Sequence, residues 1–131
     1  MSQQQPARPV LTLFLIRTAM TVGVVTFLGV AFLIRDRGDA PVLPAAAATT
    51  LSRLMYAAVG LAAAVVMALR LRLSSVTPEK RRSLSVVGWA VGEFAALFSF
   101  VAFFLTGDWQ LALPGALVFA MSLVAVPLPR D

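Results

Sequence analysis

The chain has 131 residues, of which 60% are hydrophobic and 13% charged, and its formal net charge is +5. A soluble domain contains about 45–50% apolar residues, so this excess indicates a protein whose solvent is a lipid bilayer. The sequence has no cysteine and no histidine, which excludes disulfides, thiolate chemistry, zinc and iron–sulfur sites and histidine ligation of haem. We therefore expect no enzyme activity, no metal site and no cofactor bound by the chain's own ligands. A lipid, or a pigment held by a partner, would only contact the chain.

Four apolar segments follow one another along the sequence. They cover residues 10–34, 51–69, 83–105 and 109–126. Each holds about 18–25 residues, enough to cross ~30 Å of hydrocarbon at 1.5 Å per residue. Backbone polar groups in lipid must be satisfied within their own segment, so each segment is predicted to be an α-helix. The predicted fold is all-α: an integral membrane four-helix bundle forming a single transmembrane domain over residues 1–131.

Basic residues are concentrated in the second connection. The stretch "RLRLSSVTPEKRRS" contains Arg70, Arg72, Lys80, Arg81 and Arg82. The positive-inside rule then places this loop and both termini in the cytoplasm, and the protein in the bacterial inner membrane. The loop either serves as a topology signal only, or its arginines at 70, 72, 81 and 82 contact a partner or anionic lipids. Nucleic acid is not expected as a partner, because the charges lie between apolar segments.

Three ionisable residues lie inside the apolar segments: Arg17, Arg53 and Glu93. At 1.5 Å per residue, Arg17 is ~12 Å and Glu93 ~15 Å from the cytoplasmic end, whereas Arg53 is ~25 Å away, near the outer interface. Charged groups at membrane depth are costly and mark structural pairs or functional sites. One interpretation is an Arg17–Glu93 ion pair that joins the first helix to the third. The alternatives are a proton or ion site at Glu93, or a contact between Glu93 and a partner or cofactor.

Small residues recur at helical spacing in two of the segments. In the third they are Gly88, Gly92, Ala96 and Ser99, and in the second Gly60 and Ala64. Small residues let helix backbones approach closely, so we expect the second and third helices to form a tight hairpin. Three aromatic residues of the third segment point elsewhere, towards lipid or a partner: Phe94, Phe98 and Phe104.

Residues 54–105 resemble the hairpin of the rotary ATP synthase c subunit. The resemblance rests on an Ala/Gly-rich helix, a basic loop and a mid-membrane glutamate in "AVGEFAALFSFVAFFL". It implies that Glu93 carries a translocated proton. The sequence differs from that family in having "AAVGLAAAVVMA" in place of repeated Gly-x-Gly, and in two further spans. The whole chain also resembles small uncharacterised four-span bacterial proteins with an "LTGD" turn, here at residues 105–108.

These features favour a non-enzymatic accessory or stabilising subunit of a larger membrane complex, respiratory or photosynthetic. Its expected partners are other membrane protein subunits and anionic lipids at the cytoplasmic face. The alternative function is proton- or ion-coupled transport that uses Glu93.

Overall fold

The described part of the chain is built from helices. The structure, a computed structural model, describes residues 7–38 and 40–128. Its elements in chain order are α1 (Ala7–Asp36), α2 (Ala45–Leu73), α3 (Pro78–Thr106), the short 3-10 helix η1 (Trp109–Leu111) and α4 (Ala112–Ala125). The all-α fold class predicted from the sequence is confirmed for these residues.

The helix boundaries follow from proline and glycine positions. Pro44 has extended backbone angles and directly precedes α2, while Pro78 opens α3, where a missing N–H costs no hydrogen bond. The carboxyl end of α3 is formed by Gly107, whose φ of 77° is a left-handed conformation that suits glycine. Pro114 is the third residue of α4, within the first turn, so it begins this helix without kinking it.

Three of the helices are long and apolar enough to cross a membrane. α1, α2 and α3 have 30, 29 and 29 residues, or ~44 Å each, which exceeds the ~30 Å hydrocarbon thickness. α4 has 14 residues, and with the preceding η1 it extends ~27 Å. The lengths and apolar composition of α1, α2 and α3 are those of membrane-spanning helices, whereas the fourth predicted span, residues 109–126, is a shorter apolar helix and is not among these three.

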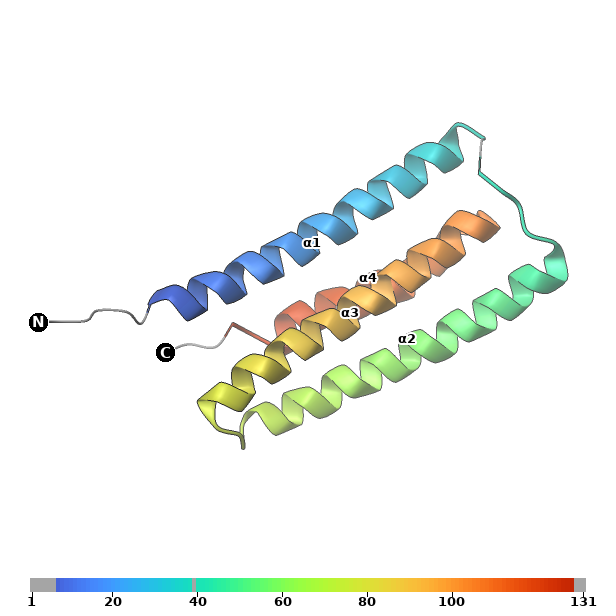
Figure 1. The fold of residues 1–131 in the computed structure, drawn as a ribbon. Helices are drawn as coiled ribbons and strands as arrows, with labels where there is room; N and C mark the ends of the chain where they lie inside the picture. The colour runs from blue at the N-terminus through green and yellow to red at the C-terminus, as the bar shows by residue number, and fades with distance from the viewer. Residues whose placement is uncertain (1–6, 39, 129–131) are drawn as a thin grey trace, which may run out of the picture.

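α3 lies at the centre of the molecule. It packs against α4, α2 and α1, and α2 also contacts α4. α1 and α2 lie on opposite sides of α3 (Figure 1). Two contacts set the position of α1 along α3: the Phe32 and Phe103 rings lie 4.6 Å apart between centroids, and the Arg17 guanidinium lies 5.6 Å from the Trp89 ring centroid.

The buried core forms two clusters along α3. The cluster nearer the α3–η1 connection includes Met55, Phe100 and Phe119, and the one nearer the α2–α3 connection includes Val66 and Trp89. Both clusters draw mainly on α2, α3 and α4. The helix α1 contributes few buried residues and leaves most of its apolar side chains exposed.

Arg35 joins the end of α1 to the end of α3. Its guanidinium lies against Gly107, and its NH1 donates a hydrogen bond to the Pro41 carbonyl at 3.2 Å. Beside it, the Leu43 N–H donates to the Leu105 carbonyl at 3.3 Å. A cation therefore sits at the carboxyl end of α3, where the helix dipole favours positive charge.

Candidate functional site

The carboxyl end of α4 is capped by side chains from the other three helices. Its last carbonyls have no partner within the helix, and Pro127 directly after Val126 prevents the helix from continuing. Arg17 of α1 donates to the Leu123 carbonyl at 2.7 Å. Arg70 of α2 donates to the Ala125 carbonyl at 3.0 Å, and Trp89 of α3 donates through Nε1 to the Val126 carbonyl at 2.7 Å. We call Arg17, Arg70 and Trp89 the α4 end cluster.

The α4 end cluster places two positive charges where an α-helix favours them. The carboxyl end of a helix carries a partial negative charge, and carbonyl groups in an apolar surrounding are costly to leave unbonded. Trp89 is fully buried, and an indole N–H in that position needs an acceptor, which Val126 supplies. The Arg17 guanidinium stacks on the indole as well, in a cation–π contact. The cluster therefore fixes the end of α4 relative to α1, α2 and α3.

The start of α4 is held by a second buried side chain. The Ser99 hydroxyl donates a short hydrogen bond to the Leu111 carbonyl and accepts one from the Gly115 N–H at 3.1 Å. At the same level, Asp108 accepts from the Gln110 N–H at 3.0 Å and opens η1. Both ends of this short helix are thus attached to α3 through side chains in addition to apolar packing.

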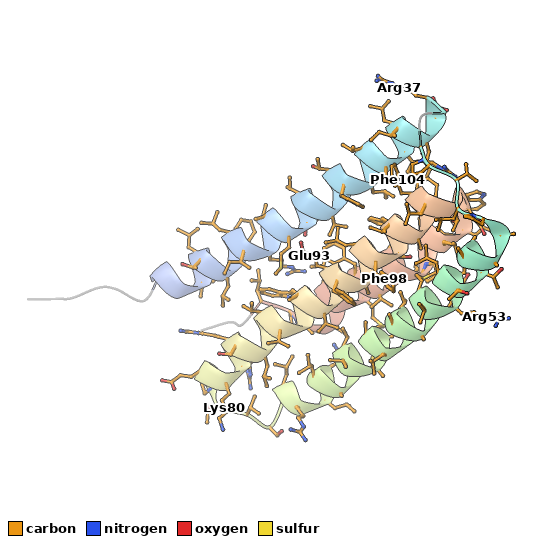
Figure 2. The ribbon with its side chains drawn as sticks, turned by 45° about the vertical axis from the view of Figure 1, so that its right-hand side comes forward. Arg37, Arg53, Lys80, Glu93, Phe98 and Phe104 are labelled. Atoms are coloured by element: carbon orange, nitrogen blue, oxygen red, sulfur yellow. The ribbon has the colours of Figure 1, made fainter. Side chains whose placement is uncertain are left out.

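Glu93 lies one helical turn above Trp89 on α3. Figure 2 shows it on the side of α3 that faces α1, and its side chain is half-buried. Its carboxylate makes no hydrogen bond or ion pair with any residue that the structure describes. Arg17, its predicted partner, is bonded to Leu123 and Trp89, so the predicted Arg17–Glu93 ion pair is not among the contacts of either residue.

The register of α1 explains this difference. Arg17 lies opposite Trp89, four residues before Glu93, and this separation corresponds to ~6 Å of helix rise. The depth estimate from the sequence placed the two charges ~3 Å apart in height. The Arg17 guanidinium instead satisfies a free carbonyl at the end of α4, and the sequence does not show which side chain reaches that carbonyl.

The predicted packing of the second helix on the third is present, but the small residues of α3 face mainly α4 and not the small residues of α2. A Cβ on Gly88 would lie 3.0 Å from Val126 Cγ2, and one on Gly92 would overlap the Ser122 side chain. Ala96 is fully buried in the core. On α2, both Gly60 and Ala64 are exposed. At the α3–α4 contact the small residues come from both helices, Gly92 and Ser99 from α3 and Ser122 and Gly115 from α4.

The three phenylalanines predicted to face outward divide into two kinds. Phe94 is 59% exposed and stacks on Phe98 at 6.0 Å between ring centroids. Phe98 and Phe104 are half-buried against the core (Figure 2). Only Phe94 therefore presents most of its surface to the surroundings.

The basic residues predicted to contact a partner or lipid lie at one end of the molecule. Arg70 and Arg81 line a cavity of about 780 Å³, and Arg72 lines a second cavity of about 480 Å³ with Lys80. Arg82 is half-buried and makes contacts of its own. No group of three or more His, Cys, Asp or Glu side chains that could hold a metal occurs in the described residues.

Comparisons of the chain with protein-family models, curated proteins and solved structures found no match.

The sequence predicted Ser99 as a packing residue but did not predict its hydrogen bonds, nor the roles of Trp89 and Gly115. A tryptophan in the middle of a small-residue stripe was the available signal for one of them, because a buried indole requires an acceptor nearby. Gly115, directly after Pro114, carried no comparable signal, since its role depends on which helix packs beside it.

Proposed function

We propose that this protein is a non-enzymatic accessory or stabilising subunit of a larger integral membrane complex, respiratory or photosynthetic. It would lie in the bacterial inner membrane as a four-helix bundle with both termini in the cytoplasm. The observation that carries this proposal is the poor coverage of α1. Only 11% of its most apolar 18-residue window is buried within the chain, against 50% for α3.

Two glycines strengthen the argument for a partner at α1. Beyond the neighbouring backbone of α1, no described atom lies within 4 Å of a Cβ built on Gly23 or Gly29. Glycine inside a helix is about 1 kcal/mol less favourable than alanine, and contact with lipid alone gives it no compensating advantage. Close approach of another transmembrane helix gives glycine such an advantage, because van der Waals packing at small residues drives helix association in membranes.

The distribution of charge supports the proposed orientation. Lys80 lies at one end of the molecule, and Arg37 and Arg53 lie at the other (Figure 2). The end with Lys80 also carries Arg70, Arg72, Arg81 and Arg82. An excess of Lys and Arg in a short loop marks the cytoplasmic side.

The test is native extraction with two matched variants. The tagged full chain, Gly29→Leu and Gly60→Leu would be extracted in mild detergent, sized by light scattering, and analysed for bound subunits by mass spectrometry. Both glycines have open space at the Cβ position, but only Gly29 lies on α1, whose most apolar window is 11% buried against 22% for α2. We expect the same membrane subunits to accompany the wild type and Gly60→Leu, and to be lost from Gly29→Leu. A wild-type chain that is monomeric and carries no other subunit would contradict the proposal.

A second candidate function is proton- or ion-coupled transport, and the unpaired Glu93 favours it. A half-buried carboxylate at membrane depth, without a partner in the described residues, is available for binding a cation. The test compares Glu93→Gln with Glu79→Gln, an exposed carboxylate in the first turn of α3, in proteoliposomes with a pH-sensitive dye. Transport through Glu93 requires that proton flux be lost in the first variant and kept in the second. Equal flux in both variants and the wild type would exclude it.

A further inference from the structure

The larger basic cavity lies where three helices end. Its wall is formed by the last turn of α2, the first turns of α3 and the residues that follow α4, and its volume is about 780 Å³. The polar side chains that line it are Arg70, Ser74, Arg81 and Ser85. Among the residues that the structure describes, no Asp or Glu belongs to this lining, and Glu79 lines the smaller cavity instead. The described lining therefore carries two positive charges and no negative one.

Arg81, which lines this cavity, has one N–H donor without a partner in the described residues. Its Nε is buried and has no hydrogen-bond partner among the described residues. A buried donor of a charged group that lacks an acceptor destabilises the protein, so a turn of the guanidinium towards an acceptor in the cavity is favoured. Arg70 uses NH1 for the Ala125 carbonyl, and a guanidinium has five N–H donors in all. Two arginines thus present donors around one space.

The apolar part of the lining indicates where the ligand comes from. Leu71, Leu73 and Leu128 line the same cavity as the arginines. It lies beyond the apolar part of α2, at the level where lipid headgroups meet water, next to the basic loop. Guanidinium groups recognise phosphate through paired N–H donors, and leucines suit the first methylenes of acyl chains.

We propose that this cavity binds the phosphate of an anionic phospholipid, with Arg81 as the main ligand and Arg70 as the second. The lipid phosphate accepts from guanidinium N–H groups of Arg81 and Arg70, and the acyl chains leave past the leucines. Basic pockets between transmembrane helices on the cytoplasmic side are suited to such headgroups. This proposal is independent of the accessory-subunit role, since it concerns the end of α2 and α3 and not the open face of α1.

The test is lipid titration of the purified full chain, followed by native mass spectrometry. The probes are dioleoyl phosphatidylglycerol and dioleoyl phosphatidylcholine, which share acyl chains and differ in net headgroup charge, and inorganic phosphate. We expect the anionic lipid to bind more tightly than the zwitterionic one. Arg81→Gln should lower the affinity for the anionic lipid about tenfold or more, because a charge-assisted hydrogen bond is lost. Arg81→Lys should retain part of the affinity, since it keeps the charge without the paired donors.

Arg72→Gln is the matched control, because Arg72 belongs to the same basic loop but lines the other cavity. It should change the affinity for the anionic lipid less than about twofold, since exposed charges contribute only diffuse attraction. Far-UV circular dichroism of each variant would show that the fold is retained. Equal loss in the Arg72 and Arg81 variants, or equal affinity for the two lipids, would overturn the proposal. If inorganic phosphate bound saturably and the anionic lipid did not displace it, the phosphate in this cavity would not come from a lipid.

Discussion

The most informative substitution in this structure is Gly115→Ala. Gly115 lies in the first turns of α4, directly against α3. A Cβ built there would overlap Ser99 Cβ and the Ala95 carbonyl oxygen, and would lie 2.8 Å from Ser99 Oγ. The carbonyl belongs to the backbone of α3 and cannot rotate away. The two helices must therefore separate to admit the methyl group.

The expected cost can be worked out from these contacts. Overpacking a close interface destabilises by roughly 1–3 kcal/mol. The same displacement weakens the bonds of Ser99 with Leu111 and Gly115, each worth about 0.5–1.5 kcal/mol. Alanine offsets about 1 kcal/mol through its higher helix propensity. We expect a net loss of about 2 kcal/mol in the free energy of unfolding.

Gly60→Ala is the control, because the space around its Cβ position is open. It brings the same gain in helix propensity without overlap, so we expect it to be neutral or to stabilise by up to about 1 kcal/mol. Both variants would be unfolded by titrating SDS into dodecyl maltoside micelles, with circular dichroism as the signal. An unchanged stability of Gly115→Ala, or an equal loss in Gly60→Ala, would refute the assigned packing of α3 on α4.

Three further predictions use the same assay. Trp89→Phe removes the bond to the Val126 carbonyl and should cost about 1–2 kcal/mol; a loss below 0.5 kcal/mol, on the order of experimental error, would contradict the proposed cap. In a double-mutant cycle of Arg17→Met and Glu93→Gln, the coupling energy should be near zero, whereas an ion pair would make removal of one partner cost roughly 3–5 kcal/mol. Gly107→Ala should lower the free energy of unfolding more than Gly38→Ala, although both glycines have a φ of 77°, because only the Gly107 methyl would overlap the Arg35 guanidinium. Equal losses in the two variants would show that the destabilisation comes from backbone strain alone.

The positions of the helices could be predicted because they depend on local features. An apolar run of sufficient length must form a helix in lipid, and Pro44, Pro78 and Gly107 bound such runs through their own backbone preferences. The basic stretch at residues 70–82 separates two apolar runs, so it lies where the two helices formed by these runs meet. These inferences need no knowledge of which helix lies beside which.

The candidate site depended on neighbours that the sequence does not specify. The stripe of Gly88 and Gly92 predicts a close helix–helix interface, but it does not identify α4 as the helix that packs there. Arg17 was recognised as an intramembrane charge, and a carboxylate on another helix was the visible partner. Its observed partner is the Leu123 carbonyl, a group that every residue carries and that becomes an acceptor only because α4 ends there.

The sequence by itself determined that this is a helical membrane protein, where its long helices lie and which end is basic, because hydrophobic length and backbone chemistry act locally. The tertiary structure alone decided that α3 is central, that α4 packs on its glycines, and that Arg17, Arg70 and Trp89 cap α4 while Glu93 stays unpaired in the described residues. A rotation of one helix by one residue, or a shift along its axis by one turn, would change each of these contacts. Helical periodicity in the sequence specifies neither the rotation nor the shift.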